Sequence, residues 1–108
     1  MTSQRVCFLL QLKPDRVQDY LAAHQHVWAD MLDALTAAGW RNYSLFVREG
    51  DGLVVGYLET DDFAAAQQRM AETEVNTLWQ AGMAEYFLSN DTNPDEQMQT
   101  LSEYFHLE

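Results

Sequence analysis

The chain has 108 residues, of which 47% are hydrophobic and 12% aromatic, so it is long enough for one compact domain with its own core. Its net charge is −11, from 17 acidic residues against six basic ones. Because the basic residues form no stripe or cluster, the sequence argues against nucleic acid and anionic membranes as partners, and favours a neutral small-molecule ligand over a phosphorylated one.

The cysteine content and the N-terminal residues bear on the cellular compartment. Cys7 is the only cysteine, which excludes an intrachain disulfide and a cysteine-rich metal site. The N-terminal residues lack the layout of a signal peptide, and no apolar stretch approaches the length of a membrane span. We therefore expect a cytoplasmic protein.

The first third of the chain predicts a strand followed by one long helix. Residues 5–12 (RVCFLLQL) are apolar on both alternating faces, which indicates a strand covered on both sides. Pro14 suits the start of a helix. From Arg16 to Ala38 apolar residues recur every three or four positions, which predicts a single amphipathic helix that Gly39 ends.

The middle of the chain predicts a β-hairpin. Residues 40–49 alternate, with Tyr43 on the apolar side and Asn42 on the other. The sequence GDG at 50–52 is a turn, and residues 53–60 form the second strand.

The last part of the chain predicts two helical pieces and a strand. Residues 61–87 are helical, with Asp61 or Asp62 capping the first piece and Thr73 the second. Residues 89–97 form a polar loop, and residues 101–107 resemble a final strand. Neither an internal repeat nor a linker divides the chain, so we expect a single domain over residues 1–108.

The element order β-α-β-β-α-β predicts an α+β fold of the ferredoxin-like type. In that arrangement the helices cover one face of a four-stranded antiparallel sheet and leave the other face open. Since the first strand is apolar on both sides, the open face should be apolar too. A second copy placed sheet against sheet would cover it, and we predict a homodimer.

His24 is the leading candidate for chemistry. With Tyr20 and Trp28 it recurs at intervals of four, which on a helix stacks the three rings on one inward face beside Leu21 and Met31. One interpretation is a histidine packed in the core. The other is a polar cavity, because a buried tyrosine needs a partner for its hydroxyl. An imidazole with a pKa of about 6.5 suits proton transfer near neutral pH.

Other chemistries are disfavoured by spacing and context. His24 and His26 lie two apart, whereas zinc pairs on helices lie four apart, so we predict no metal. His106 could add a ligand, lie near the pocket or merely end a strand. Cys7 lies in an apolar strand, where a thiol is normally inert, and no serine elbow is present.

Aromatic and amide side chains outside the first helix favour a sugar as ligand. Tyr43 and Trp79 could both be packing residues, yet sugars rest their C–H faces on such rings. Their hydroxyl groups bind amides, which are available at Gln11, Asn42 and Gln80.

Four stretches together resemble the L-rhamnose mutarotase family. QLKPDRVQDYLAAHQHVW is similar to the family's first strand and helix, with Tyr, His and Trp at intervals of four. GWRNYSLF resembles its Asn-Tyr strand, TEVNTLWQAGM its second helix and LSEYFHLE its C-terminal ending. The likeness covers nearly the whole chain, in order and at matching spacing.

The resemblance implies a dimeric ferredoxin-like α+β barrel that needs no cofactor and interconverts the α and β anomers of L-rhamnose. By position, His24 matches the family's proton donor, and Tyr20, Tyr43 and Trp79 match its sugar-binding residues. Some members carry a second tryptophan at the position of Gln80. In this chain an amide therefore stands where those members have a ring that can stack on the sugar. That departure, with His26 at a common proline position, leaves other deoxysugars such as L-fucose open.

Two alternative functions stay open at this point. Small dimeric α+β-barrel monooxygenases share the fold and also use His, Trp and Asn, so the fold alone does not separate the two activities. A non-catalytic domain would bind a sugar without exchanging its anomers.

Overall fold

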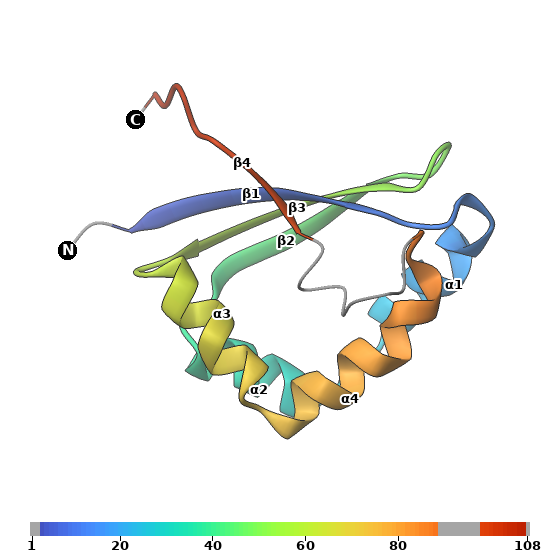
Figure 1. The fold of residues 1–108 in the computed structure, drawn as a ribbon, viewed down its shortest axis with the longest axis horizontal. Coiled ribbons are helices and arrows are strands. Elements are labelled where there is room, and N and C mark those ends of the chain that lie inside the picture. Colours follow the sequence, from blue (N-terminus) through green and yellow to red (C-terminus); the bar gives the residue numbers. More distant parts are fainter. Residues whose placement is uncertain (1–2, 89–97, 108) are drawn as a thin grey trace.

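The computed structural model describes residues 3–88 and 98–107, which fold into one sheet and one layer of helices. The strands β1 (Gln4–Gln11), β2 (Arg41–Arg48), β3 (Leu53–Thr60) and β4 (Gln99–Leu101) pair antiparallel in the order β2-β3-β1-β4. Helices separate β1 from β2 and β3 from β4 (Figure 1). This is the predicted ferredoxin-like α+β arrangement, and that prediction is confirmed.

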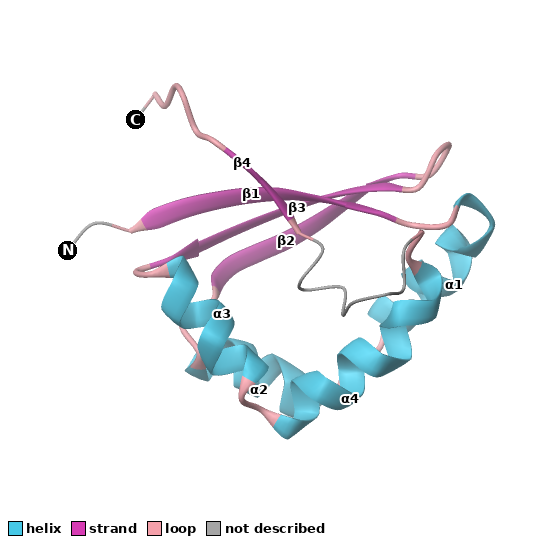
Figure 2. Cartoon of the chain, in the orientation of Figure 1, coloured by secondary structure: helices cyan, strands magenta, loops and turns pink. Residues whose placement is uncertain are grey.

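All four α-helices lie on one face of the sheet (Figure 2). They are α1 (Val17–His24), α2 (Ala29–Ala37), α3 (Phe63–Ala71) and α4 (Glu74–Met83), and short 3-10 helices span Pro14–Arg16 and Ala84–Tyr86. The side chains fully buried between the two layers include Phe8, Leu12, Val54 and Leu58. Within residues 3–88 and 98–107, none of the helices combines the length and the apolar character needed to cross a bilayer.

The prediction of one helix from Arg16 to Ala38 is wrong, because the chain leaves the helical path after His24. Residues 25–28 are not helical, and Trp28 has an extended backbone (φ −58°, ψ 138°) directly before α2. Its carbonyl oxygen accepts hydrogen bonds from the N–H groups of Met31 and Leu32, which start α2. His, Val and Trp are only moderate helix formers, so packing of the Trp28 ring on Trp79 (centroids 5.0 Å apart) outweighs the apolar periodicity.

The predicted helix ends are confirmed elsewhere. Asp62 Oδ1 accepts a hydrogen bond from the backbone N–H of Ala65 (3.1 Å), which caps α3. Thr73 Oγ1 accepts one from the N–H of Asn76 (3.2 Å), which caps α4. Gly39 ends α2 with φ +96°, a left-handed conformation that a glycine adopts without strain.

The predicted strand over residues 101–107 is largely wrong. The pairing with β1 covers only Gln99–Leu101, after which the chain turns away from the sheet (Figure 1). Residues 102–107 lack regular structure and are exposed, although β1 continues beyond the last pair, Cys7 with Leu101, as far as Gln4. One bidentate ion pair, Arg5 with Glu103, links this segment to β1. The predicted polar loop 89–97 lies outside the described residues.

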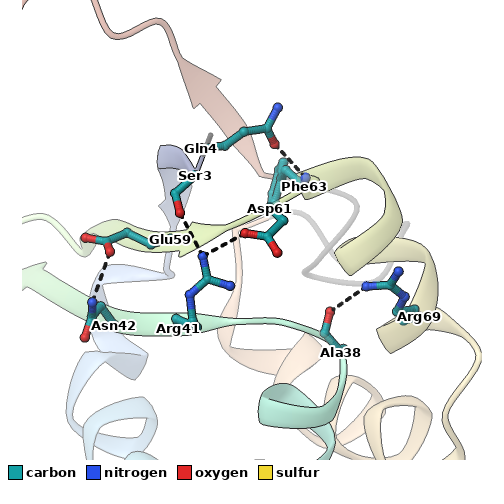
Figure 3. Close-up of polar contacts among 9 residues, drawn as sticks. All are labelled: Ser3, Gln4, Ala38, Arg41, Asn42, Glu59, Asp61, Phe63 and Arg69. Carbon is teal, nitrogen blue, oxygen red and sulfur yellow. Dashed lines mark hydrogen bonds and ion pairs between the residues drawn. The ribbon is translucent and has the colours of Figure 1, made fainter. Parts of the chain in front are cut away.

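An irregularity in β2 sets the direction of Tyr43. The pairing of β2 with β3 shifts between Arg41 and Ser44, and Asn42 has a left-handed backbone with φ +48°. The Asn42 amide donates a hydrogen bond to Glu59 Oε1 at 3.0 Å (Figure 3). Asparagine tolerates this conformation better than most residues, and the side chain of Tyr43 then packs on the core.

A corner of polar contacts fixes the ends of three elements beside this irregularity. Arg41 Nη2 donates to Ser3 Oγ (3.0 Å) and to Asp61 Oδ1 (3.1 Å), and the N–H of Phe63 donates to Gln4 Oε1 (2.6 Å), as Figure 3 shows. These contacts tie the starts of β1, β2 and α3 together.

The sheet face away from the helices carries apolar side chains, as predicted, together with polar ones from Arg5, Gln11, Ser44, Arg48, Glu59 and Gln99. Strand partners share a face, and the side chains opposite the helix layer come from all four strands. We call the following set the open face: Cys7, Leu9, Phe46, Val55, Tyr57 and Leu101. Phe46 is 60% exposed there and Leu101 51%, so this chain alone leaves considerable apolar surface in water.

Candidate active site

A cavity of about 890 Å³ lies between the helices and the sheet. Its walls come from α1, α2, β2, α3 and α4, and its volume is typical of small-molecule sites. Four of the predicted site residues line it together: His24, Tyr43, Trp79 and Gln80. Residues separated by more than 50 positions in the sequence thus share one site.

A smaller cavity of about 50 Å³ adjoins the first and brings in the fifth predicted residue. Tyr20 lines it together with the same four side chains. All five site residues predicted from the sequence therefore line one or both of these adjoining cavities.

A hydrogen bond at one ring nitrogen fixes the orientation of His24. Its Nδ1 lies 3.1 Å from the carbonyl oxygen of Tyr20, one turn earlier in α1. A carbonyl oxygen only accepts, so Nδ1 carries the hydrogen and donates it, which leaves Nε2 as the nitrogen that can exchange a proton. The ring is flanked by Tyr20 (centroids 4.3 Å apart) and by Trp79 (5.4 Å, edge on). Of the two interpretations of His24, the structure supports the one at a cavity.

Burial shifts the pKa of both polar rings in α1, those of His24 and Tyr20. It lowers the pKa of His24 below its ordinary 6.5, and the hydrogen bond to the Tyr20 carbonyl offsets this only in part. Burial also raises the pKa of the Tyr20 hydroxyl well above its usual range. At neutral pH the imidazole is therefore mostly neutral, and the phenol keeps its proton and can donate a hydrogen bond.

Trp28 does not occupy the predicted position. It lies outside α1, is 45% exposed and is not among the described cavity walls. Its ring instead packs edge on against the ring of Trp79, which lines both cavities.

Tyr43 faces the helices from β2 within an aromatic group. Its ring lies 5.0 Å from the ring of Trp40 and 6.4 Å from that of Phe8, measured between centroids. Trp40 is buried and donates its indole N–H to the carbonyl oxygen of Ala66 (3.2 Å), which fixes this side of the cavity.

Two amides that we expected as possible sugar ligands lie elsewhere. Gln11 donates to the carbonyl oxygen of Asp51 (2.6 Å) and supports the hairpin turn, and Asn42 binds Glu59. His26 and His106 are exposed and do not line either cavity, so the suggestion that His106 lies near the pocket is wrong. Within residues 3–88 and 98–107, three or more His, Cys, Asp or Glu side chains nowhere gather as a metal-ligand set.

Sequence reasoning missed four polar residues that line the larger cavity, Gln67, Gln68, Asn76 and Thr77, and it missed the apolar wall. The wall is formed by Met31, Leu35 and Leu45, which the apolar periodicity had assigned only to the core. Asn76 is buried (4% exposed), lines the larger cavity and accepts a hydrogen bond from Gln80 Nε2 at 3.1 Å. The interval of four between these two amides on one helix was the signal that could have found it.

Comparison with known proteins adds sequence evidence to this geometry. The family model described as L-rhamnose mutarotase matches residues 5–107. The chain is 34% identical over 104 residues to an L-rhamnose mutarotase of Listeria monocytogenes, with 96% of this chain and 98% of the relative covered.

Solved structures agree on the fold. The crystal structure of an L-rhamnose mutarotase from Formosa agariphila is similar with a TM-score of 0.79, at 23% identity, covering 97% of this chain and 99% of that one. A dimeric ferredoxin-like protein from an uncultured marine organism gives a TM-score of 0.60 at 12% identity, covering 99% and 95%. Because the family model matches residues 5–107 of this chain, the chain belongs to the L-rhamnose mutarotase family, whose members are carbohydrate isomerases.

Proposed function

We propose that the protein interconverts the α and β anomers of L-rhamnose, with His24 as the proton donor. The observation that carries the proposal is the position of His24 on the cavity wall, with Nδ1 held by a carbonyl oxygen and Nε2 left to exchange a proton. Membership of the mutarotase family supports anomer exchange as the reaction.

The chemistry of the cavity walls suits an uncharged 6-deoxy sugar. The described lining residues include no Lys, Arg, Asp or Glu, so a phosphate or a carboxylate would find no lysine or arginine to bind it. Amides on α4 can bind hydroxyl groups. The apolar wall (Met31, Leu35 and Leu45) can receive the methyl group at C6, which carries no hydroxyl.

The reaction needs one proton to leave and one to arrive. Protonated His24 donates the Nε2 proton to the ring oxygen while a base removes the proton of the anomeric hydroxyl, and the C1–O5 bond breaks to give an open-chain aldehyde. Rotation about C1–C2 presents the other face of the aldehyde, and the reverse transfers close the ring as the other anomer. Tyr20 keeps its proton and orients a sugar oxygen, while Tyr43 and Trp79 hold the ring.

Anomer-exchange NMR on free L-rhamnose tests the proposal. Saturation of one anomeric proton signal should transfer to the other faster with the protein than in buffer alone, and L-fucose and other deoxysugars in the same assay define the range. Sugar binding without exchange would support the binding-domain alternative, and oxygen uptake with quinol-like substrates would support the monooxygenase.

The cytoplasmic location stays a prediction, which cell fractionation checks.

We also propose that the protein is a homodimer joined through the open face. Phe46 and Leu101 are more than half exposed there, and burying apolar surface of this kind stabilises an association by about 25 cal/mol per Å² before the costs of binding. A structural neighbour is described as dimeric. Light scattering should give twice the 12.4 kDa of one chain, and Phe46→Glu should shift the protein to the monomer. A monomeric wild type at micromolar concentration would contradict the proposal.

A further inference from the structure

The two neighbouring amides on α4 differ in their access to the cavities. Asn76 is nearly fully buried, and its backbone N–H is fixed by the Thr73 cap at the start of the helix. Gln80 lies one turn later, is half-buried and lines both cavities beside His24 and Trp79. The rigid helix start therefore holds the less accessible amide, and the more accessible one faces the site.

The contact between them fixes which atoms Gln80 can offer. Gln80 Nε2 donates one hydrogen to Asn76 Oδ1 at 3.1 Å. A primary amide has two donor hydrogens and one acceptor oxygen, so the second hydrogen and Oε1 remain for a ligand. A free glutamine side chain has several rotamers and loses conformational entropy when it is immobilised. The bond to Asn76 removes much of that freedom before any ligand arrives.

We propose that Asn76 is a positioning residue that holds the Gln80 amide to recognise one hydroxyl group of the sugar. This inference rests on the proposed function and adds a determinant of substrate choice to it. An amide is neutral, like the rest of the described cavity wall, so its preferred ligand is a hydroxyl that can both donate and accept. Asn76 acts through Gln80, and its removal should weaken sugar binding while proton transfer at His24 continues.

The test measures KM and kcat for anomer exchange with L-rhamnose and with its 2-, 3- and 4-deoxy analogues. Loss of one neutral hydrogen bond should raise KM for L-rhamnose about three- to tenfold in Gln80→Leu and in Asn76→Leu, with kcat changed by less than about twofold. The wild type should discriminate against one of the three analogues, and both variants should lose that discrimination. Leu78→Ala, on the exposed side of the same helix, is the matched control and should behave as the wild type.

A double variant separates positioning from a general structural role. If Asn76 acts through Gln80, adding Asn76→Leu to Gln80→Leu should leave KM unchanged, whereas an independent effect would multiply the two factors. Asn76→Ser, whose hydroxyl is too short to reach Gln80, provides a second variant should leucine prevent folding. Unchanged KM and discrimination in both Asn76 variants would overturn this inference alone. A wild type that does not accelerate exchange would overturn it together with the proposed function.

Discussion

The Nδ1 atom of His24 donates a hydrogen bond to the backbone carbonyl oxygen of Tyr20, 3.1 Å away in the same helix. This bond gives the imidazole one orientation and one tautomer, with Nε2 as its reactive atom. Proton transfer at His24 depends on that arrangement.

Replacing His24 should remove most of the catalysis. Positioned acid–base groups contribute typically 10²- to 10⁴-fold, so we expect His24→Ala to lower the exchange rate by about that factor toward the rate in buffer. His26→Ala is the control, since that side chain is exposed two residues later and should leave the rate unchanged. NMR saturation transfer on L-rhamnose measures both. An alanine variant with full activity would remove His24 from the mechanism.

The pH profile should show which form of His24 acts. Burial lowers its pKa below 6.5, and a proton donor must be protonated in the free enzyme. We therefore expect kcat/KM for anomer exchange to fall as pH rises through that lowered pKa, with a midpoint on the acid side of 6.5. The rate in buffer is subtracted at each pH. A kcat/KM that instead rises through the same range and then levels would mean that the neutral imidazole acts first, as a base.

Gly56 should be intolerant of any side chain. A Cβ at this position of β3 would overlap the ring of Phe8, which is fully buried. Gly56→Ala should therefore lower the free energy of unfolding by about 1–3 kcal/mol in urea titrations. Gly82→Ala in α4 has open space around its Cβ and should raise that free energy by about 0.5–1 kcal/mol. Equal effects of the two substitutions would show that Phe8 can give way.

Asn42 should be replaceable by glycine but not by valine. Both substitutions remove the hydrogen bond to Glu59, and only valine is strained at φ +48°. We expect Asn42→Val to be less stable than Asn42→Gly by at least about 1–2 kcal/mol, measured by chemical unfolding. Because the irregularity directs Tyr43, the valine variant should also show a raised KM. Equal stability of the two variants would mean that the strand rearranges around the substitution.

Local signals in the sequence were sufficient for most of the fold. The caps at Asp62 and Thr73, the glycine at 39 and the hairpin turn at 50–52 depend on residues close in the chain, and each is present in the structure. The helix break after His24 depends on the contact between Trp28 and Trp79, which lie 51 positions apart, so periodicity alone could not reveal it. Likewise, β4 ends at Leu101 although β1 continues to Gln4, so the apolar pattern of residues 101–107 did not show where the pairing stops.

The wrong prediction of one long helix did not affect the prediction of the site, because the spacing of Tyr20 and His24 lies within one short helix. Tyr20 and His24 both belong to α1, so their interval of four remains helical although Trp28 lies outside. Tyr43, Trp79 and Gln80 were selected by residue type and by resemblance, and the sheet and α4 bring them to the same cavity. Asn76 was missed because an asparagine after a threonine cap is usually interpreted only as part of a helix start.

Alternation along β2 has a further consequence for an assembled enzyme. Tyr43 points to the cavity and Phe46 to the open face, so substrate capture and self-association use opposite sides of one sheet. Two copies joined through their open faces would keep the two cavities on the outer sides of the paired sheets. We therefore expect each subunit to turn over independently, with hyperbolic saturation by the sugar and a Hill coefficient near one.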